Sequence, residues 1–246
     1  MKFSQRYRIR WHETDANRML RPALLVMYMQ ETANEHLAKE AISLDALRDE
    51  KGLAFLLSSI SVVIHEPLYA RDEILVETWV SESRGLKHNR CFAVLREGKV
   101  VAEAYSVWAL MDLREKRLLR SGEEPYHLEP EQALTLPLPK RLHLPAHESM
   151  ELVGKRRIVY SDIDYNGHMN NTHYPDLFCD FTPDICSSRV TGMMFSFLHE
   201  AALGHTLSVW RARTEDGFLF RLIDEDGTVC TDALVQTIPL QGVKKA

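Results

Sequence analysis

The sequence predicts an α+β protein made of two copies of one module, each a mostly antiparallel sheet curled around one helix. The first observation is an internal repeat. Residues 9–17 (Ile-Arg-Trp-His-Glu-Thr-Asp-Ala-Asn) match residues 158–166 (Ile-Val-Tyr-Ser-Asp-Ile-Asp-Tyr-Asn) at a constant offset of 149 (158 − 9), with three identities. The second observation is the pattern of elements, because in both copies one helical segment is followed by apolar, β-rich segments separated by short turns.

Weaker matches continue downstream in the same order. His65-Glu66 and His199-Glu200 each end an apolar run, and residues 92–104 resemble residues 220–233. The duplication predicts a first module at residues 1–121, a linker at 122–150 and a second module at 151–246. The linker contains half of the ten prolines of the chain. It is expected to be extended, because proline lacks a backbone donor and disfavours helix in the residue before it.

Each module is expected to contain a strand, a polar loop, a helix and then further strands. Pro22 fits the first turn of a helix over residues 22–41, in which Leu25, Met29 and Ala33 recur at helical spacing. A shorter helix over residues 172–181 should end before Pro183. The expected strands are 6–11, 55–65, 74–83, 90–96 and 100–111 in the first module, and 156–160, 192–200, 207–213, 218–223 and 229–238 in the second.

Composition is that of an ordinary globular protein, with 45% hydrophobic and 26% charged residues and a net charge of −5. The negative charge argues against nucleic acid as a partner, and no stretch approaches the roughly 18 apolar residues of a membrane span. The first residues resemble no presequence, so no targeting peptide is expected. The four cysteines lack CxxC spacing, which favours a reducing, cytoplasmic location.

The densest polar cluster is the second loop, residues 161–174, with the sequence Ser-Asp-Ile-Asp-Tyr-Asn-Gly-His-Met-Asn-Asn-Thr-His-Tyr. It begins like a calcium-binding EF-hand loop, but the twelfth position, which should be a bidentate carboxylate, is His173. A zinc site lacks both the spacing and a third ligand, and no HExxH motif is present, so no metal or other cofactor is expected. A purely structural role stays open, because Asn170, Asn171 and Thr172 are good helix-capping residues.

The first loop, residues 12–25, lacks this chemistry. Met19 stands at the position of His168, and the amides at Asn170 and Asn171 are replaced by arginine and proline. Helix capping alone would not require this difference. We therefore expect one catalytic half and one half without catalytic residues.

The pattern Asp-x-Asp-x-Asn-x-His-x-Asn-Asn-x-x-Tyr at residues 162–174 resembles the hallmark loop of the acyl-acyl carrier protein (acyl-ACP) thioesterases, which are tandem hot-dog enzymes of plant plastids and bacteria. The resemblance covers nearly the whole chain. It implies two hot-dog modules, each a curved antiparallel β-sheet wrapped around a central helix. It also implies hydrolysis of fatty acyl-ACP thioesters, with a role in fatty acid biosynthesis.

Matched position by position, the resemblance implies Asp164, Asn166 and His168 as catalytic residues, and a downstream acid that falls on Glu200. Plant members often have cysteine directly after this acid, whereas this chain has Ala201. The difference disfavours a Cys-His-Asn mechanism and favours an acid that activates water.

A division of roles follows as a hypothesis. Glu200, at the end of an apolar strand, is expected to be partly desolvated and to act as general base. Backbone N–H groups of residues 168–170 are expected to stabilise the oxyanion. Asn166 would hold the water or the carbonyl, His168 would assist the departing thiolate, and Asp164 would orient His168 or the loop.

The substrate is expected to contact both the loop and an apolar surface. Asn170 and Asn171, together with Leu25 and Met29 on the long helix, are the predicted substrate-binding residues, although Leu and Met on a helix face serve equally well as core. Basic clusters at residues 114–120, 140–141 and 155–157 could contact the acidic carrier protein with its phosphopantetheine-linked acyl chain. A homodimer is left open.

Three other functions remain alternatives. An acyl-CoA thioesterase would use the same residues. A hot-dog dehydratase acting on 3-hydroxyacyl thioesters would also need a histidine and an acid. A non-catalytic acyl-thioester sensor would resemble the first module. The second loop retains too many polar groups for the sensor to be favoured.

Overall fold

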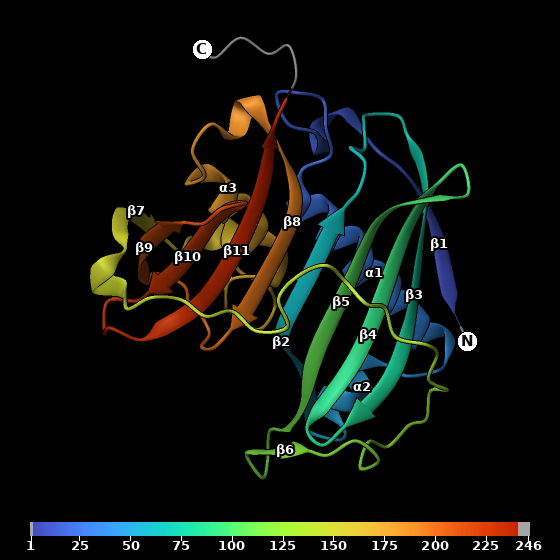
Figure 1. Cartoon of the computed structure of the whole chain (residues 1–246). Coiled ribbons are helices and arrows are strands. Elements are labelled where there is room, and N and C mark those ends of the chain that lie inside the picture. The colour runs from blue at the N-terminus through green and yellow to red at the C-terminus, as the bar shows by residue number, and fades with distance from the viewer. Residues whose placement is uncertain (1, 241–246) are drawn as a thin grey trace.

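The computed structural model describes residues 2–240, which form one 11-stranded antiparallel sheet with helices on one side (Figure 1). The strands of the first half are β1 (Phe3–Arg8), β2 (Leu53–Ile64), β3 (Glu73–Arg84), β4 (Lys87–Arg96), β5 (Lys99–Asp112) and β6 (Arg117–Leu119). Those of the second half are β7 (Glu151–Arg157), β8 (Ser188–Phe197), β9 (Thr206–Arg213), β10 (Gly217–Ile223) and β11 (Val229–Pro239). The α-helices are α1 (Pro22–Lys39), α2 (Leu44–Asp49) and α3 (Tyr174–Asp180), and short 3-10 turns are η1 (Trp11–Glu13), η2 (His147–Ser149), η3 (Tyr160–Asp162), η4 (Asn171–His173) and η5 (Ile185–Ser187).

The strand order demonstrates the duplication. The first half runs β1-β3-β4-β5-β2 and the second runs β7-β9-β10-β11-β8 from its outer edge inward, so equivalent strands occupy equivalent places. The two halves join where β2 pairs with β8 in antiparallel register, from Ser59 opposite Ser196 to Val63 opposite Gly192. The predicted α+β class with two curved antiparallel modules is therefore confirmed.

The helices form where their apolar spacing allows burial. Pro22 occupies the first turn of α1, where a missing N–H costs nothing, and Leu25, Met29 and Ala33 are buried against the sheet. In the second half α3 is only 7 residues long. Its Phe178 is fully buried, with its ring centroid 5.7 Å from that of Phe195. Aromatic pairs at this separation add to the hydrophobic stabilisation of burial.

Several elements differ from the expectation, and β1 and β8 both begin and end earlier than predicted. Helix α2 and strand β6 were not predicted, because runs of 6 and 3 residues are too short to show a period. Strand β7 ends before the predicted end, because the chain turns at Val159, whose N–H donates to the buried carboxylate of Asp162 at 2.8 Å. Ser43 caps α2 by accepting from the N–H of Ala46 at 3.1 Å, which fixes where this short helix begins.

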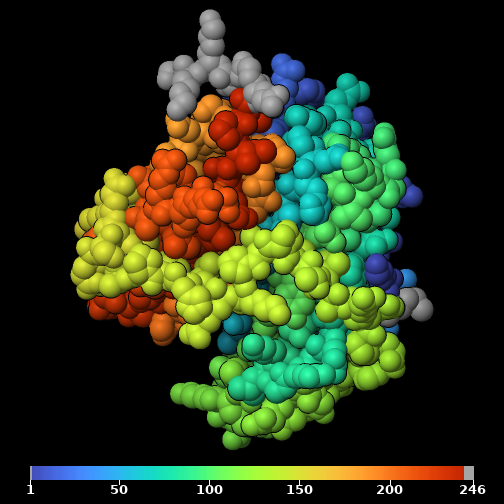
Figure 2. All heavy atoms as spheres, in the orientation of Figure 1, coloured from blue at the N-terminus to red at the C-terminus, as the bar shows by residue number. Residues whose placement is uncertain are grey.

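The segment between the halves is ordered against the sheet, and Figures 1 and 2 show it crossing the face opposite the helices. The indole Nε1 of Trp79 donates to the carbonyl of Gln132 at 2.9 Å, and Leu134 packs against the same tryptophan. Tyr126 packs with Phe55 in a second apolar cluster near β6. The segment is extended, as its prolines predicted, but the exact module boundaries stay a prediction.

No helix within residues 2–240 is long and apolar enough to cross a membrane. The main core lies between the sheet and α1 and α3, and it is continuous across the β2–β8 junction. The two modules are consequently one packed unit, which holds the polar loop of each half against the other half.

Candidate functional site

The second loop is a tight turn between β7 and α3. The N–H of Asp164 donates to the carbonyl of His168 at 3.0 Å, and the N–H of Gly167 donates to the carbonyl of Asp164 at 3.0 Å. Gly167 has φ +82°, a backbone conformation that glycine adopts without a steric penalty. This turn projects the side chains of residues 164–168 to one side of the sheet.

Asp164 shapes the loop. Its carboxylate accepts from the backbone N–H of Asn166 at 2.8 Å, which is the hydrogen bond of an Asx turn, and it lies 3.3 Å from Nδ2 of the same residue. No contact between Asp164 and the ring of His168 is found within residues 2–240. Of the two expectations for Asp164, the geometry favours orientation of the loop.

His168 and Glu200 meet across the two segments. Nε2 of His168 lies 3.2 Å from Oε2 of Glu200. The pairing is supported by the backbone, since the N–H of Met169 donates to the carbonyl of Ala201 at 2.8 Å and His168 forms a β-bridge with Ala202. The side chain of Glu200 is 62% exposed, so the desolvation that the sequence led us to expect is absent in the free protein.

Two of the three expected oxyanion donors are already used in other hydrogen bonds. The N–H of Met169 is used by Ala201, and the N–H of Asn170 donates to the carbonyl of Asp162 at 2.8 Å. The side chain of Asn170 caps the next turn, where its Oδ1 accepts from both the N–H and the hydroxyl of Thr172 at 2.9 Å. The expectation was wrong for Met169 and Asn170, because their N–H groups already stabilise the loop and the start of the helix. The N–H of His168 has no hydrogen-bond partner among residues 2–240.

Arg48 is a site residue that the sequence did not reveal. It lies in α2 of the first half, yet its Nη1 donates to Oδ1 of Asn166, and its guanidinium lies 5.3 Å from the ring centroid of Tyr165. The contact joins residues far apart in the chain, and α2 itself was not predicted. No local pattern in the sequence marks Arg48, because its partners belong to the other module.

A large cavity of about 1000 Å³ begins at this loop and extends into the first half. Its loop end contains Asp164, Asn166, His168, Asn170, Asn171 and Glu200. The rest is lined by α1, α2, β2 and β5, including Ala33, Leu37, Phe55, Leu57 and Trp108. Most of the side chains that α2, β2 and β5 contribute to this wall are apolar or aromatic, as expected of a site for a long apolar ligand.

Leu25 and Met29 do not line this cavity. Leu25 is 2% exposed and Met29 is 1% exposed, and both belong to the core between α1 and the sheet. The residues on the same helix that face the cavity are one or two turns further along, at Ala33 and Leu37. Helical spacing identified the buried face of α1 but could not distinguish core from cavity wall.

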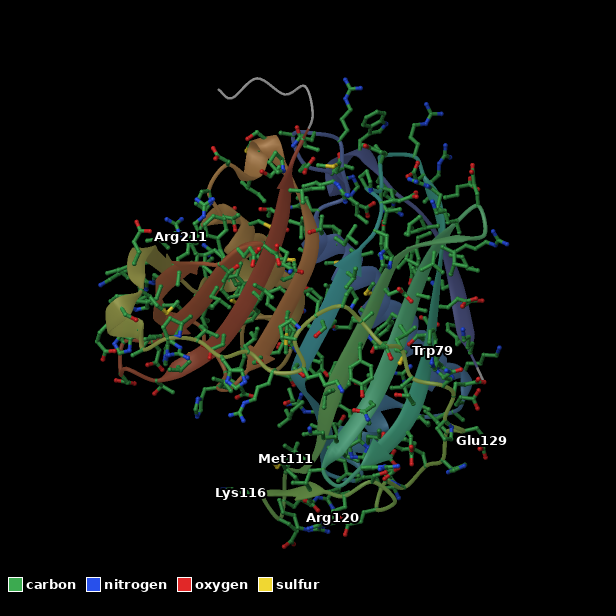
Figure 3. All side chains as sticks on the ribbon, viewed as in Figure 1. Trp79, Met111, Lys116, Arg120, Glu129 and Arg211 are labelled. Carbon is green, nitrogen blue, oxygen red and sulfur yellow. The ribbon has the colours of Figure 1, made fainter. Side chains whose placement is uncertain are left out.

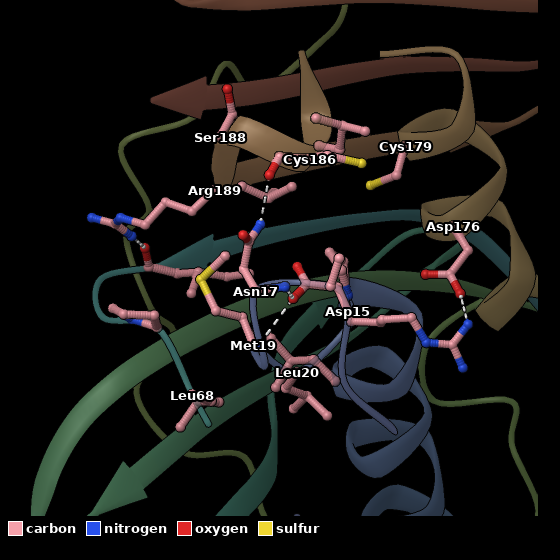
Figure 4. Close-up of a pocket in the computed structure, with 18 of the residues that line it drawn as sticks. Asp15, Asn17, Met19, Leu20, Leu68, Asp176, Cys179, Cys186, Ser188 and Arg189 are labelled. Atoms are coloured by element: carbon pink, nitrogen blue, oxygen red, sulfur yellow. Dashed lines mark hydrogen bonds and ion pairs between the residues drawn. The ribbon is translucent and has the colours of Figure 1, made fainter. Parts of the chain in front are cut away.

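The first loop has the same backbone as the second without its chemistry. The N–H of Asp15 donates to the carbonyl of Met19 at 2.8 Å, as that of Asp164 does to His168, and Arg18 has φ +62° in the place of Gly167. Figure 4 shows Asp15, Asn17 and Met19 beside a small cavity of about 210 Å³. The small cavity is the counterpart of the large one.

The hydrogen bonds also correct the pairing of His65-Glu66 with His199-Glu200. Glu66 and His199 each donate their N–H to the carbonyl of the paired strand, at Val101 and Cys230, so these two positions are equivalent. The residue that follows each is Pro67 in the first half and Glu200 in the second. Both members of the His168–Glu200 pair are therefore absent from the first half.

The loop provides neither a calcium site nor an activated thiol. Asp162, the first ligand that calcium would need, is 4% exposed and pairs with Arg156 at 2.5 Å. The pKa of Cys179 lies far above its ordinary range and that of Cys230 is raised to about 11, in both cases because the thiol is buried. These thiols stay protonated at neutral pH, and the position after Glu200 is Ala201.

The cavity ends in a polar cluster in the first half. Nη1 of Arg90 lies 3.1 Å from Nδ1 of His36, and both side chains are buried. Burial and the charge of Arg90 lower the pKa of His36 to about 4, while burial lowers the pKa of Arg90 to about 10. At neutral pH a charged guanidinium donates to a neutral imidazole.

The sequence matches the acyl-ACP thioesterase family in two parts. Residues 1–127 match the model of the acyl-ACP thioesterase N-terminal domain, and residues 147–236 match that of the C-terminal domain. A chloroplastic palmitoyl-ACP thioesterase of Gossypium hirsutum is 26% identical over 185 residues, which are 70% of this chain and 45% of that protein. A chloroplastic oleoyl-ACP thioesterase of Arabidopsis thaliana is 26% identical over 193 residues, 70% of this chain and 52% of that protein. The chain thus spans about half the length of these curated relatives.

Solved structures show the same fold. An acyl-ACP thioesterase from Bacteroides thetaiotaomicron superposes with a TM-score of 0.87 at 22% identity, covering 96% of this chain and 98% of that one. A 12:0-ACP thioesterase from Umbellularia californica gives a TM-score of 0.86 at 18% identity, covering 97% and 98%. At these identities the likeness establishes the tandem hot-dog fold.

The buried His36 predicts a pH-dependent loss of stability. The pKa of a histidine is near 6.5 in the unfolded chain, whereas that of folded His36 is about 4. Between these pH values the unfolded state binds more protons, so the protein becomes less stable as the pH decreases. We expect the free energy of unfolding to drop by roughly 2–3 kcal/mol from this group between pH 7 and pH 4.5. In His36→Gln the amide oxygen still accepts from Arg90, and the free energy of unfolding, measured with urea, should decrease less between pH 7 and pH 4.5. Equal losses in both proteins would contradict this assignment.

Proposed function

This chain belongs to the acyl-ACP thioesterase family, and we propose that it hydrolyses fatty acyl-ACP thioesters to a free fatty acid and holo-ACP. One observation supports this most directly. An imidazole and a carboxylate lie 3.2 Å apart at one end of an elongated, mainly apolar cavity, and only in the second half. A cavity of this kind accommodates an acyl chain, and the polar pair lies where the thioester would be placed.

The proposed reaction has two steps. Glu200 accepts a proton from a water molecule, whose oxygen bonds to the thioester carbonyl carbon while the carbonyl π electrons move to its oxygen. Glu200 passes this proton to Nε2 of His168, which lies 3.2 Å away. The C–S bond then breaks as the carbonyl re-forms, and the His168 imidazolium donates a proton to the departing phosphopantetheine thiolate, which returns both side chains to their starting states. A bound acyl chain excludes water from this end of the cavity, which supplies the desolvation that Glu200 lacks in the free protein.

Asn166 is proposed to stabilise the oxyanion in place of the backbone amides. Because Arg48 donates to Oδ1 of Asn166, the amide is held with its Nδ2 directed away from Arg48. One N–H of that group lies toward Asp164, and the other is left to donate to the carbonyl oxygen. The equivalent amide in the first loop is held by its other end, since Nδ2 of Asn17 donates to the carbonyl of Cys186 at 2.9 Å.

The carrier protein is proposed to dock at the β5–β6 end of the large cavity. Met111, Leu113 and Leu118 line the cavity there, and Figure 3 shows Lys116 and Arg120 beside them at this end of the molecule. Acidic partners associate faster with basic surfaces of this kind. The other basic clusters, at residues 140–141 and 155–157, do not line the cavity. A cytoplasmic location and a homodimer stay predictions.

The acyl-CoA alternative uses the same catalytic residues, so only substrate comparison separates it. A kcat/KM that is higher for an acyl-ACP than for the matched acyl-CoA supports the carrier protein as substrate. A higher kcat/KM for the acyl-CoA would favour a coenzyme A thioester hydrolase. An enoyl product without free thiol would favour a dehydratase.

Glu200→Gln should remove the general base without changing the shape of the site. We expect kcat for thiol release from an acyl-ACP to fall by about 10²–10⁴ with KM nearly unchanged. Glu225→Gln, in the exposed β10–β11 turn, is the matched control and should behave as wild type. Unchanged turnover in Glu200→Gln would eliminate Glu200 as the base.

Arg48→Met should misorient Asn166. Loss of a charge-assisted hydrogen bond costs about 1.5–3 kcal/mol, so kcat should fall roughly 10- to 100-fold, mainly without a change in KM, and Arg48→Lys should restore part of it. Arg84→Met, which removes an 83% exposed arginine, serves as control. A change in KM alone would show that Arg48 binds substrate and does not orient Asn166.

A further inference from the structure

The far end of the large cavity contains a charge that an ordinary fatty acyl chain could not use. Arg90 in β4 lines the cavity but is only 7% exposed. Its neighbours there are His88 on the same face of β4, together with Phe55, Trp108 and Tyr126. A charged side chain in such surroundings is costly unless something pairs with it.

Arg90 has no acidic partner among residues 2–240. Its two side-chain hydrogen bonds both use Nη1, which lies 3.1 Å from Nδ1 of His36 and 3.2 Å from Oγ1 of Thr78. His36 is neutral at physiological pH because its pKa is about 4. The guanidinium is therefore held in place by neutral acceptors and its charge is not balanced by a carboxylate.

The remaining donors of Arg90 have the geometry of a carboxylate site. Nε and Nη2 make no hydrogen bond within the described chain, and these two groups point in parallel from one side of a guanidinium. That arrangement matches the two oxygens of a carboxylate. Nε2 of His88 is also buried without a hydrogen-bond partner in the same part of the chain, so the cluster has a further open polar position beside Arg90.

The position along the cavity sets the ligand length. The catalytic Glu200 follows β8, and β8 is separated from β4 by β2 and β5, which is three strand spacings or about 14 Å. An extended chain advances about 1.2 Å per bond, judged from the rise of three backbone bonds per residue. The distance across the strands alone therefore requires roughly a dozen bonds, which is a lower limit on the ligand length.

We propose that the preferred substrates are acyl-ACP thioesters whose chain ends in a carboxylate, that is, half-thioesters of dicarboxylic acids of medium length. The inference rests on the proposed function, because it places the thioester at His168 and Glu200. The apolar wall between the two ends contacts the methylene chain, and Arg90 pairs with the terminal carboxylate.

The test compares dodecanoyl-ACP with ACP loaded with the half-thioester of dodecanedioic acid. Wild-type protein should hydrolyse the second with a kcat/KM roughly ten- to a hundredfold higher. Arg90→Met should lose this preference and Arg90→Lys should keep part of it. Arg96→Met is the matched control, because Arg96 lies in the same strand, pairs with Glu66 and Asp72, and does not line the cavity. A wild-type preference for dodecanoyl-ACP, or an unchanged preference in Arg90→Met, would overturn the proposal.

A binding measurement separates this proposal from the proposed function. Free dodecanedioic acid should raise the Tm of wild type more than dodecanoic acid does, and Arg90→Met should abolish the difference. If neither thioester is hydrolysed but the diacid still stabilises wild type selectively, the hydrolase fails and the carboxylate site stands. If dodecanoyl-ACP is hydrolysed and the diacid gives no selective shift, only the carboxylate site fails.

Discussion

The structure depends on the pairing of β2 with β8. These strands contribute the inner edges of the two modules, and their register from Ser59–Ser196 to Val63–Gly192 makes one continuous sheet and one continuous core. Because the join is antiparallel, each polar loop lies over the module to which it does not belong. The second loop therefore meets α2 and the large cavity of the first half, as the Arg48–Asn166 contact shows.

This arrangement allows the two halves to differ. A duplicated chain has two equivalent loops and two equivalent cavities. The continuous sheet requires only the backbone of the two loops to be preserved, so their side chains are free to differ. The first loop keeps the Asp15 turn and replaces the imidazole with Met19 and the acid with Pro67. Its cavity is about 210 Å³ against about 1000 Å³ for the other. In the proposed function, the second half provides the catalytic residues and the first half provides most of the space for the ligand.

Much of this could be predicted from the sequence, because the repeat and the strand spacing are local signals. The duplication, most strands and α1 follow from patterns in the chain, whereas the convergence of Asn166, His168 and Glu200 was implied by the resemblance to the acyl-ACP thioesterases. The contacts of Arg48 and Arg90 could not be predicted from the sequence, since both depend on which helices and strands meet in the folded protein. The N–H groups of Met169 and Asn170 were wrongly expected to bind an oxyanion for a related reason: the sequence shows that a helix begins near Asn170, but not that Asp162 already accepts the N–H of Asn170. The roles of the site residues remain proposals.

If the second loop alone performs the chemistry, replacing its imidazole by the side chain that the first loop has at the same position is the most direct test. His168→Met gives the second loop the side chain of the first, with a similar volume and no titratable group, while Met19→Ala alters the first loop. In single-turnover thiol release from an acyl-ACP, we expect the rate to fall by a factor on the order of 10²–10⁴ in His168→Met and to stay at the wild-type value in Met19→Ala. Wild-type rates in His168→Met, or an equal loss in Met19→Ala, would contradict this expectation.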